Sequence, residues 1–171
     1  MVYIGRLGQE KDIQTLLEIY NDAVMNSTAT FDLQPQTLDQ RSAWFPEHTG
    51  DHPLVAVEES GLVVGYATLS TFRDKPAYSK TAESSVYVRR SHRGKGVGRA
   101  AMNMTISKAR ELGYHTIVAG IVPPNEASVR LHTSLGFERV GDFRGGFQVR
   151  EMAERRVLPA NPRRRLADSC G

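Results

Sequence analysis

The sequence has almost no cysteine. Among its 171 residues Cys170 alone carries a thiol, and it lies next to the last residue. A single thiol excludes an intramolecular disulfide framework and a metal site built from cysteines. Long apolar runs are also absent, and the first residues lack the basic and then apolar pattern of a secretory signal. We therefore expect a cytoplasmic protein without a membrane-spanning segment.

The chain also has little excess of charge of either sign. The formal net charge is +3, and much of the basic excess is local, in ERR at 154–156 and RRR at 163–165. The rest of the chain is close to neutral, which gives no reason to expect nucleic acid as a partner. A hydrophobic fraction of 40% and a charged fraction of 24% are typical of one soluble globular domain of this length.

The hydrophobic pattern changes between the helical and the strand period along the chain. The predicted order is strand, helix, helix, three strands, helix, strand, helix and strand, with Asp12 and Thr37 as N-caps of the first two helices. Predicted strands cover 2–7, 53–59, 62–71, 82–88, 116–122 and 137–141, and predicted helices cover 12–24, 37–45, 98–113 and 125–136. This order predicts a mixed α/β layer fold.

The stretch RSHRGKGVGR at 90–99 places three glycines between a strand and a helix. The first turn of a helix exposes main-chain N–H groups, and its dipole adds partial positive charge, so such a junction favours an anion. Glycine lets the main chain approach a phosphate, and Arg93, Lys95 and Arg99 can add charge-assisted hydrogen bonds. The spacing fits neither a dinucleotide-binding fingerprint nor a P-loop, and an exposed basic turn is the alternative interpretation.

The spacing Arg93-x-x-Gly96-x-Gly98 resembles the pyrophosphate loop of the GCN5-related N-acetyltransferases, which bind acetyl-CoA. One branch, the phosphinothricin and methionine sulfoximine acetyltransferases, is similar in ESSVYV, RGKGVG and NEASVRLHTSLGF, and also in IYNDAVMNSTATFD, RSAWF and FRDKPAYSKTAE. The resemblance covers residues 2–144. It implies a mixed, mostly antiparallel sheet flanked by helices, acetyl-CoA as acetyl donor, a small amine as substrate, no metal, and a homodimer.

The resemblance also implies a set of residues that contact the cofactor. The main chain of one strand would bind the pantetheine arm like an added strand, and the glycine segment would hold the pyrophosphate. Asn125 would face the cofactor while it also caps the helix that follows it. The residues expected at the cofactor are Val86, Tyr87, Val88, Arg93, Gly94, Lys95, Gly96, Val97, Gly98, Arg99 and Asn125.

Catalytic roles follow from the same resemblance. Glu83 would hold the amine or accept its proton, because an ammonium must lose a proton before it attacks a thioester. The N–H near Val88 would stabilise the oxyanion, and His132 resembles the histidine of the family's LH pair, although a lone histidine on an apolar helix face is more often structural. The residues expected at the acceptor are Phe31, Arg73, Asp74, Lys75, Tyr78, Glu83, Ser84 and Ser85.

Two positions depart from the pattern of the branch. Many members have an arginine where Ser79 stands and a histidine where Ser84 stands. These departures affect the identity of the substrate rather than the reaction. Three functions are therefore open: acetylation of a small amino acid or a toxic analogue, acetylation of a peptide amino terminus, and non-catalytic binding of an acyl-CoA on the same fold.

The resemblance stops after GDFRG, which divides the chain into an N-acetyltransferase domain at 1–145 and an arginine-rich tail at 146–171. Codons can be chosen for residues 146–166 so that the same nucleotides encode a second sequence when the reading frame is shifted by one nucleotide. This second sequence, GFKFGKWLNVAFYQRILDGD, resembles the usual ending of the family. We interpret the tail as the product of a frameshift, with the final strand lost or altered. A basic tail that binds an anionic partner is the alternative.

Overall fold

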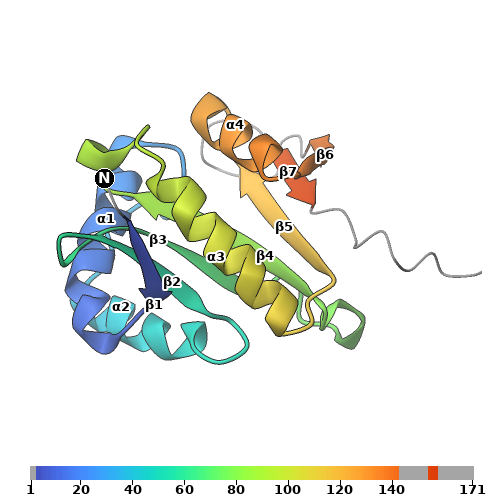
Figure 1. Cartoon of the computed structure of the whole chain (residues 1–171), viewed down its shortest axis with the longest axis horizontal. Coiled ribbons are helices and arrows are strands. Elements are labelled where there is room, and N and C mark those ends of the chain that lie inside the picture. The colour runs from blue at the N-terminus through green and yellow to red at the C-terminus, as the bar shows by residue number, and fades with distance from the viewer. Residues whose placement is uncertain (1–2, 143–153, 158–171) are drawn as a thin grey trace, which may run out of the picture.

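A computed structural model describes residues 3–142 and the main chain of 154–157, and the first ten elements follow the predicted order (Figure 1). The elements are β1 (Ile4–Leu7), α1 (Ile13–Asn26), α2 (Leu38–Trp44), β2 (Leu54–Glu59), β3 (Leu62–Thr71), β4 (Thr81–Val88), α3 (Val97–Glu111), β5 (Thr116–Ile121), α4 (Glu126–Ser134), β6 (Glu138–Asp142) and β7 (Glu154–Val157). In the described part of the chain no helix is long and apolar enough to cross a membrane.

The strands form a single mixed sheet in the order β1-β2-β3-β4-β5-β7-β6. Neighbours are antiparallel except β4 and β5, which run parallel. The predicted α/β layer fold with a mostly antiparallel sheet is therefore confirmed. The parallel pair is joined through α3, as expected, because parallel strands need a crossover connection.

The last strand decides one half of an expectation. We expected this strand to be lost or altered by the tail. It is not lost, because β7 is present between β5 and β6, whereas its alteration stays a prediction. Main-chain hydrogen bonds form such a ladder whatever the side chains are, so an extended segment of almost any composition can occupy this place. The rest of the tail, 146–153 and 158–171, lies outside the described residues.

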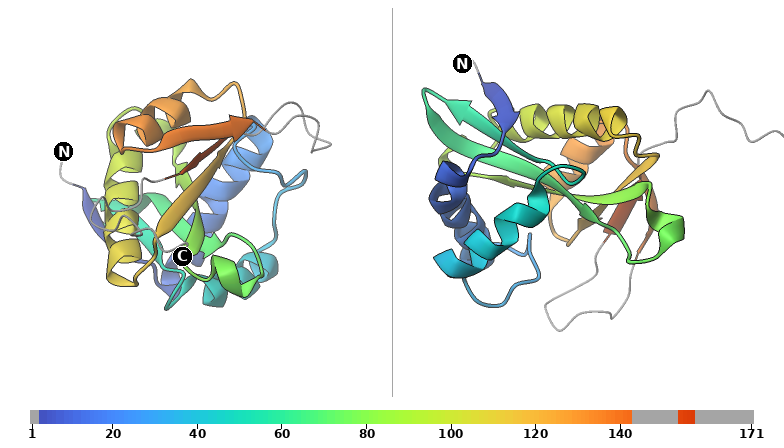
Figure 2. Two further views of the ribbon diagram at one scale, coloured as in Figure 1. Left: turned by 90° about the vertical axis from the view of Figure 1, so that its right-hand side faces the viewer. Right: turned by 90° about the horizontal axis from the view of Figure 1, so that it is seen from below.

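Helices cover both faces of the sheet, as Figure 2 shows, with α3 on one face and α1 and α2 on the other. The α3 face has a core that includes Ala67, Leu69, Ala82, Ala101, Met102 and Ile117. The opposite face has a second core that includes Leu16, Ile19, Phe45, Leu54 and Tyr66. Side chains alternate between the two faces along each strand, so β3 and β4 contribute to both cores.

The two predicted helix caps have different outcomes. Thr37 caps α2 as predicted, because its hydroxyl accepts a hydrogen bond from Gln40 N at 3.2 Å. Asp12 is not a side-chain cap of α1; its carboxylate is bound by the guanidinium of Arg6 and by Gln9 N, at 2.7 to 2.8 Å. Burial raises the pKa of Asp12, but the hydrogen bonds from Arg6 and Gln9 N, together with the charges of Arg6 and Lys11, hold that pKa below its usual value.

Candidate active site

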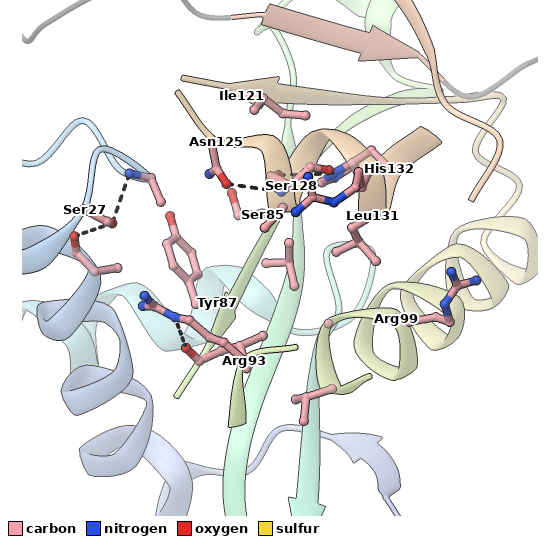
Figure 3. A pocket seen from close by; sticks show the side chains of 18 of the residues that line it. Ser27, Ser85, Tyr87, Arg93, Arg99, Ile121, Asn125, Ser128, Leu131 and His132 are labelled. Carbon is pink, nitrogen blue, oxygen red and sulfur yellow. Dashed lines mark hydrogen bonds between the residues drawn. The ribbon is translucent and has the colours of Figure 1, made fainter. Parts of the chain in front are cut away.

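The sheet splits between β4 and β5. Their parallel pairing runs from Thr81–Thr116 to Ser84–Ala119; beyond it, β4 stays paired with β3 as far as Val88 and β5 pairs with β7. A cavity of about 850 Å³ opens at this split. Figure 3 shows that side chains from β4, from α4 and from the connection after α1 surround it. The topology therefore places a cleft beside the half of β4 that no longer pairs with β5.

The glycine segment turns into α3 at the wall of this cavity. Gly94 and Gly96 have φ values of 73° and 90°, a conformation that residues with a side chain rarely adopt. The helix is capped at Gly96, whose carbonyl accepts from Ala100 N at 3.0 Å, so the N–H groups of 97–99 precede the first helical hydrogen bond. Together with the helix dipole, these groups make the start of α3 favourable for an anion.

Two of the predicted basic residues hold defined positions at the cavity. Arg93 donates from Nε to the carbonyl of Val88 at 3.2 Å and pairs with the carboxylate of Asp22 at 3.2 Å. Arg99 donates to the hydroxyl of Ser134 at 2.9 Å. Both guanidinium groups therefore line the cavity with defined neighbours, as Figure 3 shows for their side chains. A phosphate bound there would gain charge-assisted hydrogen bonds.

The cavity collects nearly the whole set of residues that was predicted at the cofactor. Asn125 caps α4, because its side-chain oxygen accepts from Ser128 N at 3.2 Å, and it also lines the cavity, so both expected roles are compatible. Among the predicted cofactor residues, Lys95 is the one that does not line the cavity. The residues that do line it are Val86, Tyr87, Val88, Arg93, Gly94, Gly96, Val97, Gly98, Arg99 and Asn125.

Glu83 lies on β4 immediately before the split. Its carboxylate leans toward Gly120 of β5, which lines the cavity: a Cβ atom placed on Gly120 would lie 3.3 Å from Glu83 Oε1. Because Gly120 has no side chain, the carboxylate reaches the point where the two strands part. An acceptor amine at this end of the cavity would therefore meet a negative charge.

The two residues predicted for acid–base and oxyanion roles are not together. Glu83 and Val88 are five residues apart on one strand, which is about 16 Å at the usual rise of a strand. Val88 lies with the glycine segment instead, since its Cγ2 would be 3.6 Å from a Cβ on Gly98. At this separation the two residues do not reach one acetyl group together, so the predicted oxyanion role of Val88 stays a prediction.

His132 is packed into α4. Its side chain is buried, Nδ1 lies 2.8 Å from the carbonyl oxygen of Ser128, and the ring meets Phe137 edge-on at 4.9 Å. These contacts fix the ring against the helix. Although His132 belongs to the cavity wall, its packing supports the structural interpretation that was given for a histidine on an apolar face.

The residues predicted at the acceptor divide into three groups. Ser84 and Ser85 line the cavity at the split. Glu83 precedes them on β4 and lies just outside the lining. The other five lie on connections outside the lining, Phe31 between α1 and α2, and Arg73, Asp74, Lys75 and Tyr78 between β3 and β4. The Arg73 guanidinium lies 5.4 Å from the Phe72 ring and 5.9 Å from the Tyr78 ring. The cavity therefore brings together the cofactor residues more completely than the acceptor residues.

Sequence reasoning missed one wall of the cavity. The connection after α1 contributes Ser27, Thr28 and Ala29, and α4 contributes Arg130. The polar NSTAT segment is the signal that could have drawn attention to this connection. Nothing local in the sequence places it at the cavity, because its position depends on how α1 packs on the sheet.

A buried cation behind the cavity wall was also missed. Arg41 of α2 is almost fully buried, donates to the hydroxyl of Tyr66, and lies 3.5 Å above the centre of the Trp44 ring. Tyr87, which lines the cavity, packs against Tyr66 with ring centres 5.3 Å apart. Burial raises the pKa of Tyr87, and the nearby Arg41 charge opposes that shift only in part. Tyr87 is therefore a neutral hydroxyl at neutral pH.

Within residues 3–142, no group of histidine, cysteine and acidic side chains is arranged to hold a metal ion. The features present are a split sheet, an anion-binding helix start at one end of the cavity, and a carboxylate at the other. They suit an elongated ligand with phosphates at one end and an extended arm that lies along β4. The fold and the site thus have the shape and polarity of a class of proteins that bind a nucleotide-like cofactor with an arm.

Comparisons with known proteins agree with this class. The model of the acetyltransferase (GNAT) family matches residues 14–137, and the chain belongs to this family. The L-methionine sulfoximine/L-methionine sulfone acetyltransferase of Salmonella typhimurium is 40% identical over 133 residues, which are 77% of this chain and 78% of that protein. The phosphinothricin N-acetyltransferase of Streptomyces coelicolor is 39% identical over 143 residues, 81% of this chain and 84% of that protein.

A solved structure has the same fold over its whole length. The yncA protein of Salmonella typhimurium, determined with its cofactor acetyl-CoA, aligns with a TM-score of 0.90 at 33% identity, and the alignment covers 99% of this chain and 100% of that one. The resemblance to the GCN5-related acetyltransferases and to the branch named in the sequence analysis is therefore confirmed.

Proposed function

We propose that this protein transfers the acetyl group of acetyl-CoA to the amino group of a small amino acid or a toxic analogue, such as phosphinothricin, methionine sulfoximine or methionine sulfone. The observation that supports this most is the glycine-rich start of α3 at the split between β4 and β5. The acceptor class rests on the names of the relatives, each 39 to 40% identical.

Two parts of acetyl-CoA, the pyrophosphate and the pantetheine arm, match separate parts of the cavity. The N–H groups of 97–99, with Arg93 and Arg99, would bind the pyrophosphate. The main chain of 85–88, on the side that faces the cavity, would bind the amide groups of the arm as an added strand would. Gly98 lets the start of α3 lie close to α4 at the cavity wall, since a Cβ there would lie 3.2 Å from Leu131 Cδ2.

When bound, acetyl-CoA supplies an activated thioester whose carbonyl carbon accepts the amine nitrogen, with the CoA thiol as leaving group. The contribution of Glu83 is to attract the ammonium and to receive its proton, directly or through one water, which leaves a neutral nucleophile. Gly120 keeps this carboxylate accessible. Because thiols are much more acidic than amines, the departing thiolate has no need of a strong general acid.

A thiol-release assay tests the proposal with acetyl-CoA and a panel of acceptors: ordinary amino acids, phosphinothricin, methionine sulfoximine, methionine sulfone, and short peptides with a free amino terminus. Turnover with free amino acids or their analogues, well above turnover with peptides, is the expected result. Preference for peptides would favour amino-terminal acetylation. Tight acetyl-CoA binding without turnover on any acceptor would favour a non-catalytic binding domain. The homodimer implied by the family resemblance is part of this proposal, and light scattering measures it.

A further inference from the structure

The buried histidine His48, which contacts Ser70 on β3, has a defined hydrogen-bonding state. His48 ends the short helix Phe45–His48 that follows α2, and its ring stacks on Trp44 with centres 3.9 Å apart. Its Nδ1 lies 3.1 Å from the carbonyl oxygen of Trp44, and its Nε2 lies 3.1 Å from the hydroxyl oxygen of Ser70 on β3. Both ring nitrogens therefore have partners.

These two partners determine where the hydrogens are. A carbonyl oxygen can only accept, so the hydrogen of a neutral ring is on Nδ1, and Nε2 is left as an acceptor. Ser70 must then donate its single hydroxyl hydrogen to His48. Burial lowers the pKa of His48, as do the nearby Arg41 and His52, while the Trp44 carbonyl and Glu47 act in the opposite direction. The net lowering agrees with a neutral ring.

Ser70 lies directly across from Glu83. The two residues are register partners in the antiparallel pair of β3 and β4, so their side chains leave the same face of the sheet. Such partners have Cβ atoms about 4.5–5.5 Å apart. The next pair on this face is Thr68 and Ser85, and Ser85 lines the cavity. The Ser70 oxygen, with its hydrogen committed to His48, is therefore an acceptor on the strand next to Glu83, on the same face of the sheet.

We propose that Ser70 is a further residue of the acceptor site, whose oxygen accepts an N–H hydrogen of the incoming amine while Glu83 provides the charge, and that His48 positions Ser70 for this. An ammonium group has three donors and no acceptor, so it matches a carboxylate beside a hydroxyl that can only accept. The inference rests on the proposed acetyltransferase function, and it assigns the part of the site that recognises the amino group.

The test uses three variants of the full chain: Ser70→Ala, His48→Phe and the double variant. His48→Phe keeps a ring against Trp44 but cannot accept from Ser70, whose hydroxyl can then turn its hydrogen toward Glu83. We expect each single variant to raise KM for the amine about 10-fold or more, the range for one hydrogen bond to a charged group. KM for acetyl-CoA should stay within about twofold, because the phosphate end is unchanged. The double variant should be no worse than the poorer single one, since both break one relay.

A similar hydroxyl–histidine pair at the next residue of β3 provides the control. Thr71 bonds His52 through the same kinds of groups, hydroxyl oxygen to Nε2 at 3.3 Å, but it leaves the opposite face of β3. Thr71→Val should therefore leave both KM values unchanged. Ser70→Thr, which keeps the hydroxyl, should retain most of the activity that Ser70→Ala loses.

The outcomes separate the inference from the function on which it rests. An active wild-type protein with a Ser70→Ala variant of unchanged amine KM overturns the inference alone. So do losses that add in the double variant, or that appear equally in the KM for acetyl-CoA, because a purely structural role would produce them. A wild-type protein that acetylates none of the amines overturns the proposed function, and the inference with it.

Discussion

Gly96 offers the sharpest test of the phosphate site. Its φ of 90° is unfavourable for any residue with a side chain, but the space around it is open, because a Cβ there would meet nothing within 4 Å. Gly96→Ala should cost about 1–2 kcal/mol of folding stability, the usual penalty for a left-handed residue with a Cβ. Gly113, at the far end of α3, has a φ of 75° and equally little around it apart from Lys80 Nζ at 3.8 Å. Gly113→Ala should therefore have the same penalty far from the cavity.

Relaxation of that strain at Gly96 would move the N–H groups of 97–99 away from a bound pyrophosphate. Loss of one charge-assisted hydrogen bond, worth about 1.5–3 kcal/mol, corresponds to roughly 10- to 150-fold weaker binding. We expect calorimetry to show this loss of acetyl-CoA affinity for Gly96→Ala and near-normal affinity for Gly113→Ala, with similar decreases in melting temperature. If Gly96→Ala binds acetyl-CoA as the wild type does, the glycine segment is not the phosphate site and the reasoning fails.

Three further predictions concern the other end of the cavity. Glu83→Gln should bind acetyl-CoA normally but lower kcat, least at high pH where free amine is abundant; an unaltered pH–rate profile would remove Glu83 from the mechanism. Gly120→Ala, whose methyl group would lie 3.3 Å from Glu83 Oε1, should displace that carboxylate and reduce turnover without a change in melting temperature of more than a few degrees. The free energy of unfolding should fall as pH drops below about 6.5, because His48 has a lowered pKa in the folded protein and takes up a proton when the chain unfolds. Denaturant unfolding of His48→Phe should lack this contribution to the pH dependence. An equal pH dependence in the variant and the wild type would contradict the prediction.

The glycine turn and the start of α3 could be predicted from the sequence because their determinants are local. Glycines between a strand and a helix determine where the chain turns and where N–H groups are exposed, within ten consecutive residues. The cap at Asn125 is local in the same way, and the structure confirms it. Periodicity likewise predicted the order of the first ten elements, because each period depends on neighbours a few residues apart.

The acceptor end could not be predicted in the same way, since its contacts join distant parts of the chain. His48 meets Ser70 across 22 residues, and Arg41 meets Tyr66 across 25. A cap prediction failed for the same reason: Asp12 has a suitable residue type before α1, but the guanidinium of Arg6 on β1 binds its carboxylate. Partners that tertiary packing provides compete with local ones, and a sequence pattern shows only the local ones.

The presence of β7 changes what the frameshift hypothesis predicts. Main-chain pairing with β5 and β6 is compatible with many sequences, so a shifted frame can keep the strand and still replace the side chains around it. The hypothesis then predicts lost side-chain packing rather than a lost strand. Restoring the ending GFKFGKWLNVAFYQ would bury four or five more apolar side chains, which is worth on the order of several kcal/mol before the entropy of ordering is subtracted.

Restoring the frame should therefore raise the melting temperature and the acetylation rate together. The comparison requires a melting curve and a thiol-release assay on the chain with either ending, and the DNA sequence across codons 144–147 of the native gene decides the origin of the tail. An intact frame there contradicts the hypothesis directly. Equal stability and activity of the two chains would show that the arginine-rich tail is a functional part of the protein, and its clustered positive charge would then point to an anionic partner.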